Sequence, residues 1–141
     1  WPLFSHKAGP AARPVYDPRR SRLTPRQRFE IAVGAILTQN TAWTNVEKAM
    51  IALHRRKVLS LEALRRIHRP RLAKLIRSSG YFNQKSKKLK GFIRFLDREF
   101  SGKSPLEKMR RLPPSAARLR LLDVSGIGPE TADSILSAGI M

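Results

Sequence analysis

The sequence contains no cysteine, which excludes disulfides, thiolate zinc sites and a cysteine nucleophile within its 141 residues. For the same reason the chain cannot hold an iron–sulfur cluster through cysteine. Its three histidines (His6, His54 and His68) are scattered, so no metal site is expected, and no other cofactor is evident. Long apolar runs are also missing: no segment approaches the ~18 residues that cross a bilayer, and no secretory signal is visible. We therefore expect no membrane partner.

Acidic residues are few. Ten Asp and Glu face 29 Lys and Arg, which gives a formal net charge of +19. Positive side chains in such excess repel one another unless an anion lies close to them. In proteins this anion is usually a nucleic acid. The alternative is a basic structural protein that binds RNA or ribosomes. Charge and length together favour a single nucleic-acid-binding domain.

Residues 1–23 are predicted to form an extended arm rich in Pro and Arg. Its prolines interrupt any helix, and its apolar residues show no period. Arginines gather at the end of the arm and the start of the next segment: Arg19, Arg20, Arg22, Arg26 and Arg28. The arm is either a disordered leader or a strap that lies along phosphates. Because the first residue is Trp1 rather than methionine, we expect a fragment or a processed form.

Residues 24–141 are predicted to form an all-α domain of about eight helices with short connections. Thr24, Pro25 and Gln27 show the capping-box pattern before a helix that is apolar nearly all round and should be buried. Further candidate caps are Thr41, Ser60 and the box formed by Ser104, Pro105 and Glu107. Alternating β-branched runs are missing, so no strands are expected.

The longest predicted helix covers residues 83–100. Its apolar stripe consists of Leu89, Phe92, Ile93, Leu96 and Phe100. Basic residues are expected on its remaining surface, namely Lys85, Lys87, Lys88, Lys90 and Arg94. Such basic faces should make the affinity for a nucleic acid fall steeply as the salt concentration rises.

The most informative segment is the turn between the last two predicted helices, over about 115–123 and 129–138. It contains Gly126, Ile127 and Gly128, and a proline begins the second helix. Glycines allow positive φ and a close approach of the backbone to a ligand, while Ile127 should pack between the helices. Successive amides and the helix N-terminus then form an anion site suited to a DNA phosphate. A Gly-x-Gly turn also ends many ordinary helices, but the flanking helices, the proline and the charge favour DNA binding.

Three blocks of sequence, in the same order, resemble the endonuclease III superfamily of helix-hairpin-helix DNA glycosylases. VSGIGPETADSIL resembles the helix-hairpin-helix, FEIAVGAILTQNTAWTNVEKA the second-helix block, and SGYFNQKSKKL the start of a long helix. The resemblance covers about residues 29–138 and leans toward bacterial 3-methyladenine glycosylases. It implies an all-α glycosylase fold with the helix-hairpin-helix at about 115–138 and the C-terminal part missing.

The resemblance implies base-excision repair by a DNA N-glycosylase that recognises a flipped, damaged base in double-stranded DNA. In the family, the residue that matches Gln39 fills the gap left by the displaced base. Asn40, Thr41 and Thr131 are expected to contact DNA beside Gln39 and the hairpin. Trp43 is either a core residue or, together with Trp1, a wall of the base pocket that stacks on a cationic alkylated purine.

Two departures from the family pattern concern catalysis. Glu130 stands where lyase members carry a lysine, so no Schiff base can form there and we expect a monofunctional enzyme. A carboxylate at Glu130 instead suits the first turn of a helix. The catalytic aspartate of the family is expected beyond Met141, and Asp133 is a poor substitute. No catalytic residue is therefore assigned, and we expect the chain to be incomplete at its C-terminus.

The overall expectation is a monomeric, cytoplasmic, nucleoid-associated bacterial protein that acts on damaged duplex DNA. A monovalent cation at the hairpin is compatible with the sequence. The alternative is a non-catalytic helix-hairpin-helix module that only binds duplex DNA. Effects of Gln39 and Trp43 that are confined to damaged DNA would separate the two.

Overall fold

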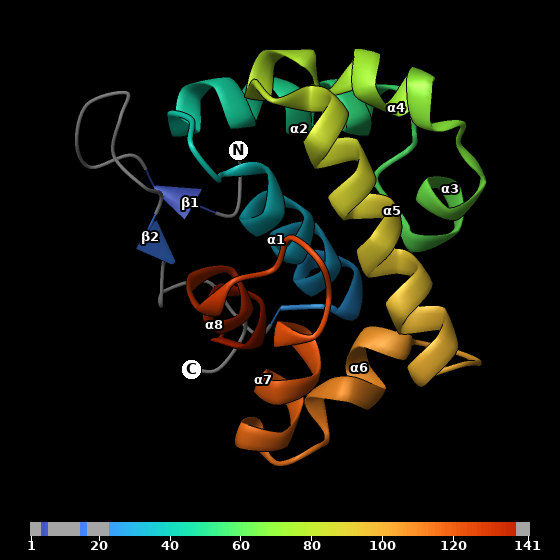
Figure 1. Ribbon diagram of the computed structural model, residues 1–141. Helices are drawn as coiled ribbons and strands as arrows, with labels where there is room; N and C mark the ends of the chain where they lie inside the picture. The colour runs from blue at the N-terminus through green and yellow to red at the C-terminus, as the bar shows by residue number, and fades with distance from the viewer. Residues whose placement is uncertain (1–3, 6–14, 17–22, 138–141) are drawn as a thin grey trace.

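The computed structural model describes residues 4–5, 15–16 and 23–137 (Figure 1). Its helices are α1 (Pro25–Leu37), α2 (Trp43–Arg55), α3 (Leu61–Arg66), α4 (Arg69–Leu75), α5 (Phe82–Glu99), α6 (Pro105–Arg110), α7 (Pro114–Leu122) and α8 (Pro129–Ser137). A 3₁₀ helix, η1 (Arg77–Ser79), lies between α4 and α5. The predicted all-α class and the order of its helices are confirmed. Within these described ranges, no helix is long and apolar enough to cross a membrane.

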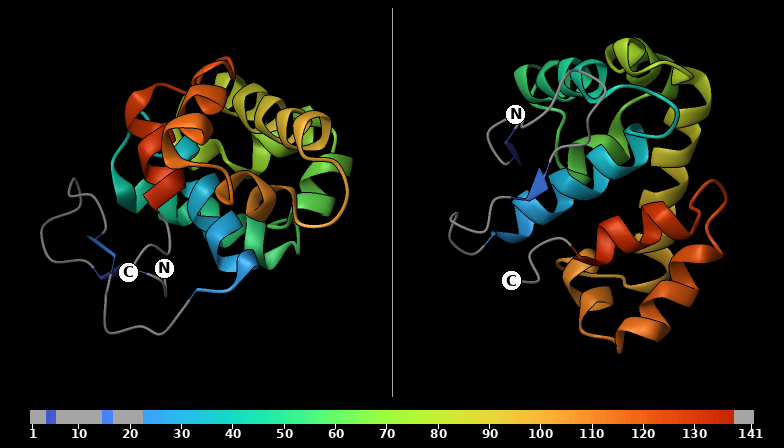
Figure 2. Two further views of the ribbon diagram at one scale, coloured as in Figure 1. Left: turned by 90° about the horizontal axis from the view of Figure 1, so that it is seen from below. Right: turned by 90° about the vertical axis from the view of Figure 1, so that its left-hand side faces the viewer.

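Helix α1 runs through the centre of the molecule, in contact with α2, α5, α6 and α8 (Figures 1 and 2). Its start is fixed by a complete capping box. Gln27 N donates to Oγ1 of Thr24 at 3.1 Å, and Thr24 N donates to Oε1 of Gln27 at 2.8 Å. At its other end Ile36 and Leu37 are fully buried. The prediction of a capped, buried helix is confirmed.

Helix α5 matches the predicted long helix to within one residue at each end, and its apolar stripe is buried as expected. The prediction that Lys85 lies on the surface is wrong. Lys85 is 1% exposed, and its Nζ donates to the carbonyl of Ser79 at the end of η1, at 2.6 Å. A lysine stem can be buried when its ammonium finds such an oxygen. Burial, together with the charge of Lys88, lowers the pKa of Lys85 to about 8.

Two predicted helix caps are wrong. Helix α2 begins two residues after Thr41, so Thr41 does not cap it. Ser104 precedes α6 with φ +53°, and its side chain makes no cap hydrogen bond. The carboxylate of Glu107, which a capping box requires, pairs instead with the guanidinium of Arg28 at 2.6 Å. This ion pair joins α6 to α1, and a local pattern cannot reveal such a long-range partner. The predicted cap at Ser60 is confirmed, because its Oγ accepts from Ala63 N at 3.2 Å.

The expectation of no strands is wrong for the arm, which contains a short two-stranded ladder. Strand β1 (Phe4–Ser5) pairs antiparallel with β2 (Val15–Tyr16). Strands of two residues are too short to show an alternating pattern. The arginines predicted to form a strap at Arg19, Arg20 and Arg22 lie outside the described residues. Arg28 is bound to Glu107 and to the carbonyl of Leu23, so its guanidinium is not available to a phosphate.

Candidate DNA interface

The turn between α7 and α8 has the hairpin geometry that the sequence predicts. The amide of Val124 donates to the carbonyl of Leu121 at 3.0 Å, and the amide of Ile127 donates to the carbonyl of Val124 at 3.1 Å. Gly126 has φ +88°, a conformation that favours glycine. The side chain of Ile127 is 4% exposed and belongs to the hydrophobic core. The predicted inward packing of Ile127 is confirmed.

Gly128 differs from Gly126. Its φ is not positive, so only Gly126 uses the conformational freedom that the sequence offers at both glycines. A Cβ at Gly128 would meet nothing within 4 Å, which leaves the backbone open to a ligand just before α8. Within the described part of the chain, the amides of Gly126 and Gly128 donate to no acceptor. Two main-chain donors are therefore available beside the positive end of the α8 dipole.

The side chain of Gln39 lies against this hairpin. Its Nε2 donates to the carbonyl of Gly126 at 3.1 Å and to Oγ1 of Thr131 at 2.8 Å. Gln39 belongs to the turn that follows α1, and α1 packs against α8. Packing of these two helices thus brings the Gln39 turn next to the hairpin, two regions that the sequence analysis had identified separately.

Lys88 completes the site, and sequence analysis missed its role. Its Nζ donates to Oε1 of Gln39 at 2.6 Å. Its stem lies across Gly126, where an added Cβ would stand 2.5 Å from Cγ of Lys88. We call Gln39, Lys88, Gly126 and Thr131 the hairpin cluster. The sequence signal was weak, because Lys88 is only one of several basic residues off the apolar stripe of α5.

The other candidates near Gln39 differ in exposure. Asn40 is exposed with φ +56°, and Thr41 is half-buried; both lie in the turn between α1 and α2. Trp43 is 3% exposed and lies 3.8 Å from the position that a Cβ of Gly34 would occupy. This burial accounts for Trp43 as a core residue. Its role in a base pocket stays a prediction, and Trp1 lies outside the described residues.

Two acids lie on α8, after the hairpin. Glu130 is exposed in the first turn, the predicted place, where a negative charge complements the helix dipole. Oδ1 of Asp133 accepts from Nε of Arg118 at 2.8 Å, an ion pair between α7 and α8 at the surface. Asp133 therefore joins the two helices of the hairpin. Among the described residues, no group of three His, Asp or Glu side chains could hold a metal ion.

Comparisons with known proteins agree with this fold. Residues 33–122 match the HhH-GPD superfamily of base excision DNA repair proteins. A Methanocaldococcus jannaschii protein named as a DNA repair glycosylase is 38% identical over 109 residues, which is 77% of this chain and 49% of that protein. The crystal structure of H. pylori 3-methyladenine DNA glycosylase (MagIII) bound to 1,N6-ethenoadenine has a TM-score of 0.67 and 32% identity, over 77% of this chain and 50% of that one.

The chain thus spans about half the length of both relatives. The superfamily match covers more than half of the chain, and it includes α2 to α7. The solved relative shares both the fold and about a third of the aligned residues. The resemblance stated from the three sequence blocks is therefore confirmed, and the chain belongs to the HhH-GPD superfamily of base excision DNA repair proteins.

Proposed function

We propose that the protein acts in base-excision DNA repair as a DNA N-glycosylase, and that the described residues bind the duplex and displace the damaged base. The hairpin cluster carries this proposal. It places two amides that have no acceptor in the described chain, those of Gly126 and Gly128, beside a glutamine and a lysine. Because the chain belongs to a superfamily of base excision repair proteins, the anion that suits these donors is a DNA phosphate.

The phosphate contact holds the protein on the duplex without reading its sequence. Main-chain donors cannot distinguish bases, so the hairpin suits a protein that searches for a lesion in any sequence. The ammonium of Lys88 adds a positive charge at the same place. The open space in front of Gly128 allows a phosphate to approach the backbone closely.

Gln39 supplies the group that fills the gap in the base stack. A side-chain amide both donates and accepts hydrogen bonds, so it can pair with the base left without a partner once its Nε2 leaves the carbonyl of Gly126 and Oγ1 of Thr131, which take both of its hydrogens in the DNA-free chain. The nitrogen of this amide donates to Oγ1 of Thr131, and its oxygen accepts from Nζ of Lys88. Gap filling and phosphate binding therefore take place at one location, which supports their coupling. Asn40 and Thr41 are proposed to contact the same DNA.

The proposed enzyme is monofunctional, since Glu130 cannot form the Schiff base of a lyase. The lesion class to test first is an alkylated or etheno-modified purine, because the H. pylori relative is a 3-methyladenine glycosylase solved with 1,N6-ethenoadenine. The proposal includes a monomer that acts in the bacterial cytoplasm at the nucleoid. It also includes a monovalent cation at the hairpin.

A non-catalytic duplex-binding module is the second candidate. The donors of the hairpin would serve it equally well, and Asp133, already a poor substitute for the family's aspartate, is occupied by its ion pair with Arg118. In this case the protein would bind damaged and intact duplexes alike.

Two measurements test the proposal. The first compares the affinity of the 141-residue chain for a duplex that carries one alkylated purine with its affinity for the same duplex undamaged; we expect tighter binding to the damaged duplex. The second follows release of the free base by chromatography, with the protein as its cell produces it, because the family's aspartate is expected beyond Met141. Equal affinity for both duplexes, with no base released by that protein, would contradict the glycosylase proposal and support the second candidate.

A further inference from the structure

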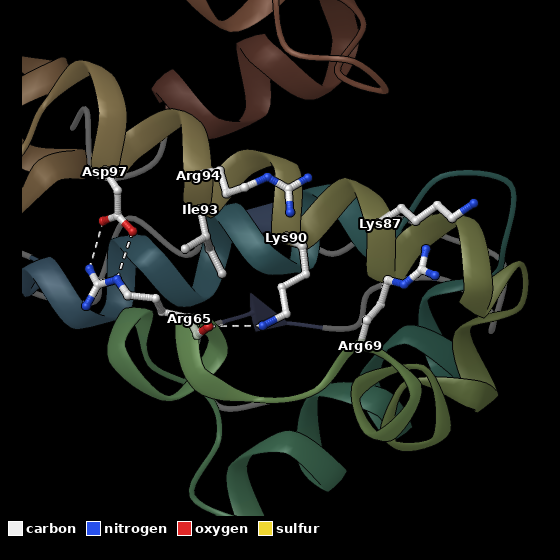
Figure 3. Close-up of a pocket in the computed structure, with 7 residues that line it drawn as sticks. All are labelled: Arg65, Arg69, Lys87, Lys90, Ile93, Arg94 and Asp97. Atoms are coloured by element: carbon white, nitrogen blue, oxygen red, sulfur yellow. Dashed lines mark hydrogen bonds and ion pairs between the residues drawn. The ribbon is translucent and has the colours of Figure 1, made fainter.

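A second basic site lies between α5 and the helices α3 and α4 (Figure 3). It is a groove of about 400 Å³. Its cationic lining residues are Arg65, Arg69, Lys87, Lys90 and Arg94, and its one acid is Asp97. We call this site the basic groove. Five cations and one anion give its lining a formal charge of +4.

The basic groove is not an extension of the hairpin cluster. Lys88 reaches the hairpin from one face of α5. At about 100° per residue, Lys90 and Asp97 are each rotated by about 180–200° from Lys88 around the helix axis. Figure 1 shows the same separation, with α3 and α4 on one side of α5 and α7 and α8 on the other. The two sites therefore face in opposite directions.

Two of the five cations are fixed by the fold. Nε and Nη2 of Arg65 each donate to a carboxylate oxygen of Asp97 at 2.8 Å, and this hydrogen bonding raises the pKa of Arg65. Nζ of Lys90 donates to the carbonyls of Leu64 and Arg65 at 2.7 and 3.1 Å, at the end of α3. Burial and the charge of Arg94 lower the pKa of Lys90. These contacts hold the walls of the groove together.

The other three cations are available to a ligand. Arg69, Lys87 and Arg94 are exposed, and within the described ranges they form no ion pair or hydrogen bond. Figure 3 shows Lys87 and Arg94 on α5 and Arg69 on the facing helix. Three cations around one groove repel each other, and an anionic ligand would relieve that repulsion.

We infer that the basic groove binds the phosphodiester backbone of a second nucleic-acid segment. Lys87 and Arg94 are seven residues apart on α5 (Phe82–Glu99), so they span about 10 Å of helix. Over that length of its axis, a DNA duplex presents about three phosphates on each strand. Arg69 contacts the backbone from the other wall. The groove lining contains no aromatic side chain, and Ile93 is 2% exposed, so the site offers no aromatic surface on which a base could stack.

This inference goes beyond the proposed function. Phosphate binding by the groove does not depend on the hairpin, but the count of two bound segments rests on the hairpin as the first site. A protein with two phosphate-binding sites on opposite faces can hold two DNA segments at once. It can then pass from one segment to another without full dissociation. A peptide rich in Asp and Glu is the competing ligand, and the test below includes it.

The test counts the DNA molecules that each 141-residue chain binds, by native mass spectrometry and sedimentation. The probe is a duplex short enough to occupy one site. The groove variant combines Arg69→Gln, Lys87→Gln and Arg94→Gln. The matched control combines Arg66→Gln, Arg71→Gln and Lys74→Gln, which removes the same charge from exposed positions of α3 and α4 outside the groove lining. Circular dichroism checks that both variants are folded.

We expect the unmodified chain and the control variant to bind two duplexes, and the groove variant to bind one. The salt slope of the second binding step should fall by about three when the three cations are removed. Equal stoichiometry and equal slopes in the groove and control variants would overturn the inference. If Gly126→Ala left binding unchanged while the groove variant lost one duplex, the hairpin proposal would fail and the groove inference would stand.

Titration with single-stranded DNA of the same length shows whether the groove binds the phosphodiester backbone of a duplex or that of a single strand. Loss of one bound molecule in the groove variant, with either the duplex or the single strand, supports phosphodiester binding and identifies its source. A polyglutamate peptide of equal charge is the second probe. If this peptide bound the groove as tightly as either DNA, the assignment to nucleic acid would be overturned in favour of an acidic protein segment.

Discussion

The ammonium of Lys88 donates a 2.6 Å hydrogen bond to Oε1 of Gln39, two residues 49 positions apart in the chain. The other end of the Gln39 amide donates to Gly126 and Thr131 in the hairpin segment. Three segments of the chain thus meet at one side chain. A change at Lys88 should therefore affect how Gln39 acts on DNA, although Lys88 lies on a different helix.

Lys88→Met should weaken binding to damaged duplex in a way that depends on Gln39. Methionine keeps an unbranched apolar chain over Gly126 but cannot donate to Oε1 of Gln39. A double-mutant cycle with Gln39→Ala is expected to give a coupling of about 1 kcal/mol in binding free energy. Affinities from fluorescence anisotropy on lesion-containing duplex measure this coupling. Strictly additive effects would show that the contact has no role in binding.

The two hairpin glycines should respond differently to alanine. Gly126→Ala places a Cβ at φ +88° and 2.5 Å from Lys88, so it should lower the free energy of unfolding by about 1–3 kcal/mol. Gly128→Ala has open space and no positive φ, so it should leave stability nearly unchanged. Both variants should weaken DNA binding, because each adds a methyl group beside an amide that we propose faces the phosphate. Urea unfolding and DNA titration of the same samples separate the two effects.

Gly91→Ala is the control for these variants. Gly91 lies within α5, and a Cβ there meets nothing within 4 Å. Alanine at this position should stabilise the helix by up to about 1 kcal/mol and leave DNA binding unchanged. A loss of affinity in Gly91→Ala equal to that in Gly128→Ala would show that the hairpin position has no special role.

Borohydride treatment of the chain with abasic-site DNA should trap no covalent adduct. The hairpin carries Glu130 where a lyase needs an amine, and a carboxylate forms no Schiff base. A glycosylase with lyase activity serves as the positive control. If an adduct appeared, Lys88→Met would show whether the one amine of the hairpin cluster had formed it, and the monofunctional assignment would be withdrawn.

Lys85 should make stability depend on pH in a defined direction. Its pKa is about 8 in the folded chain and 10.5 ordinarily, so between these values the unfolded chain binds more protons. The free energy of unfolding should therefore rise as the pH increases from about 8 to 10.5. Lys85→Met should remove this rise, whereas Lys87→Met, at an exposed position of the same helix, should keep it. Urea unfolding across the window measures the difference, and parallel curves for all three proteins would refute the assignment.

Features that depend on neighbouring residues were predictable from the sequence. The Thr24 capping box, the apolar stripe of α5 and the Gly126 turn all depend on residues a few positions apart. The hairpin was recognisable because Gly126, Ile127 and Gly128 are adjacent in the sequence and lie between two helical patterns. These local patterns were sufficient for the fold class and for the place of the site.

Features that depend on distant partners were not predictable. Glu107 pairs with Arg28 across 79 positions, and that pairing overrode the expected cap at Ser104. Lys85 is buried because the carbonyl of Ser79 meets its ammonium. Lys88 resembled the other basic residues of α5 until the fold placed Gln39 within hydrogen-bonding distance. In each case the missing information was the packing of one helix against another.

The central claim is that the amides of Gly126 and Gly128 bind a DNA phosphate, and the ¹⁵N resonances of these two glycines test it directly. Titration with duplex DNA should shift both amide signals among the most strongly affected in the chain, together with the side-chain amide of Gln39. The shifts should saturate with the duplex and weaken as salt is added. If both glycine signals stayed in place while the duplex bound elsewhere, the hairpin would not be the DNA-binding site.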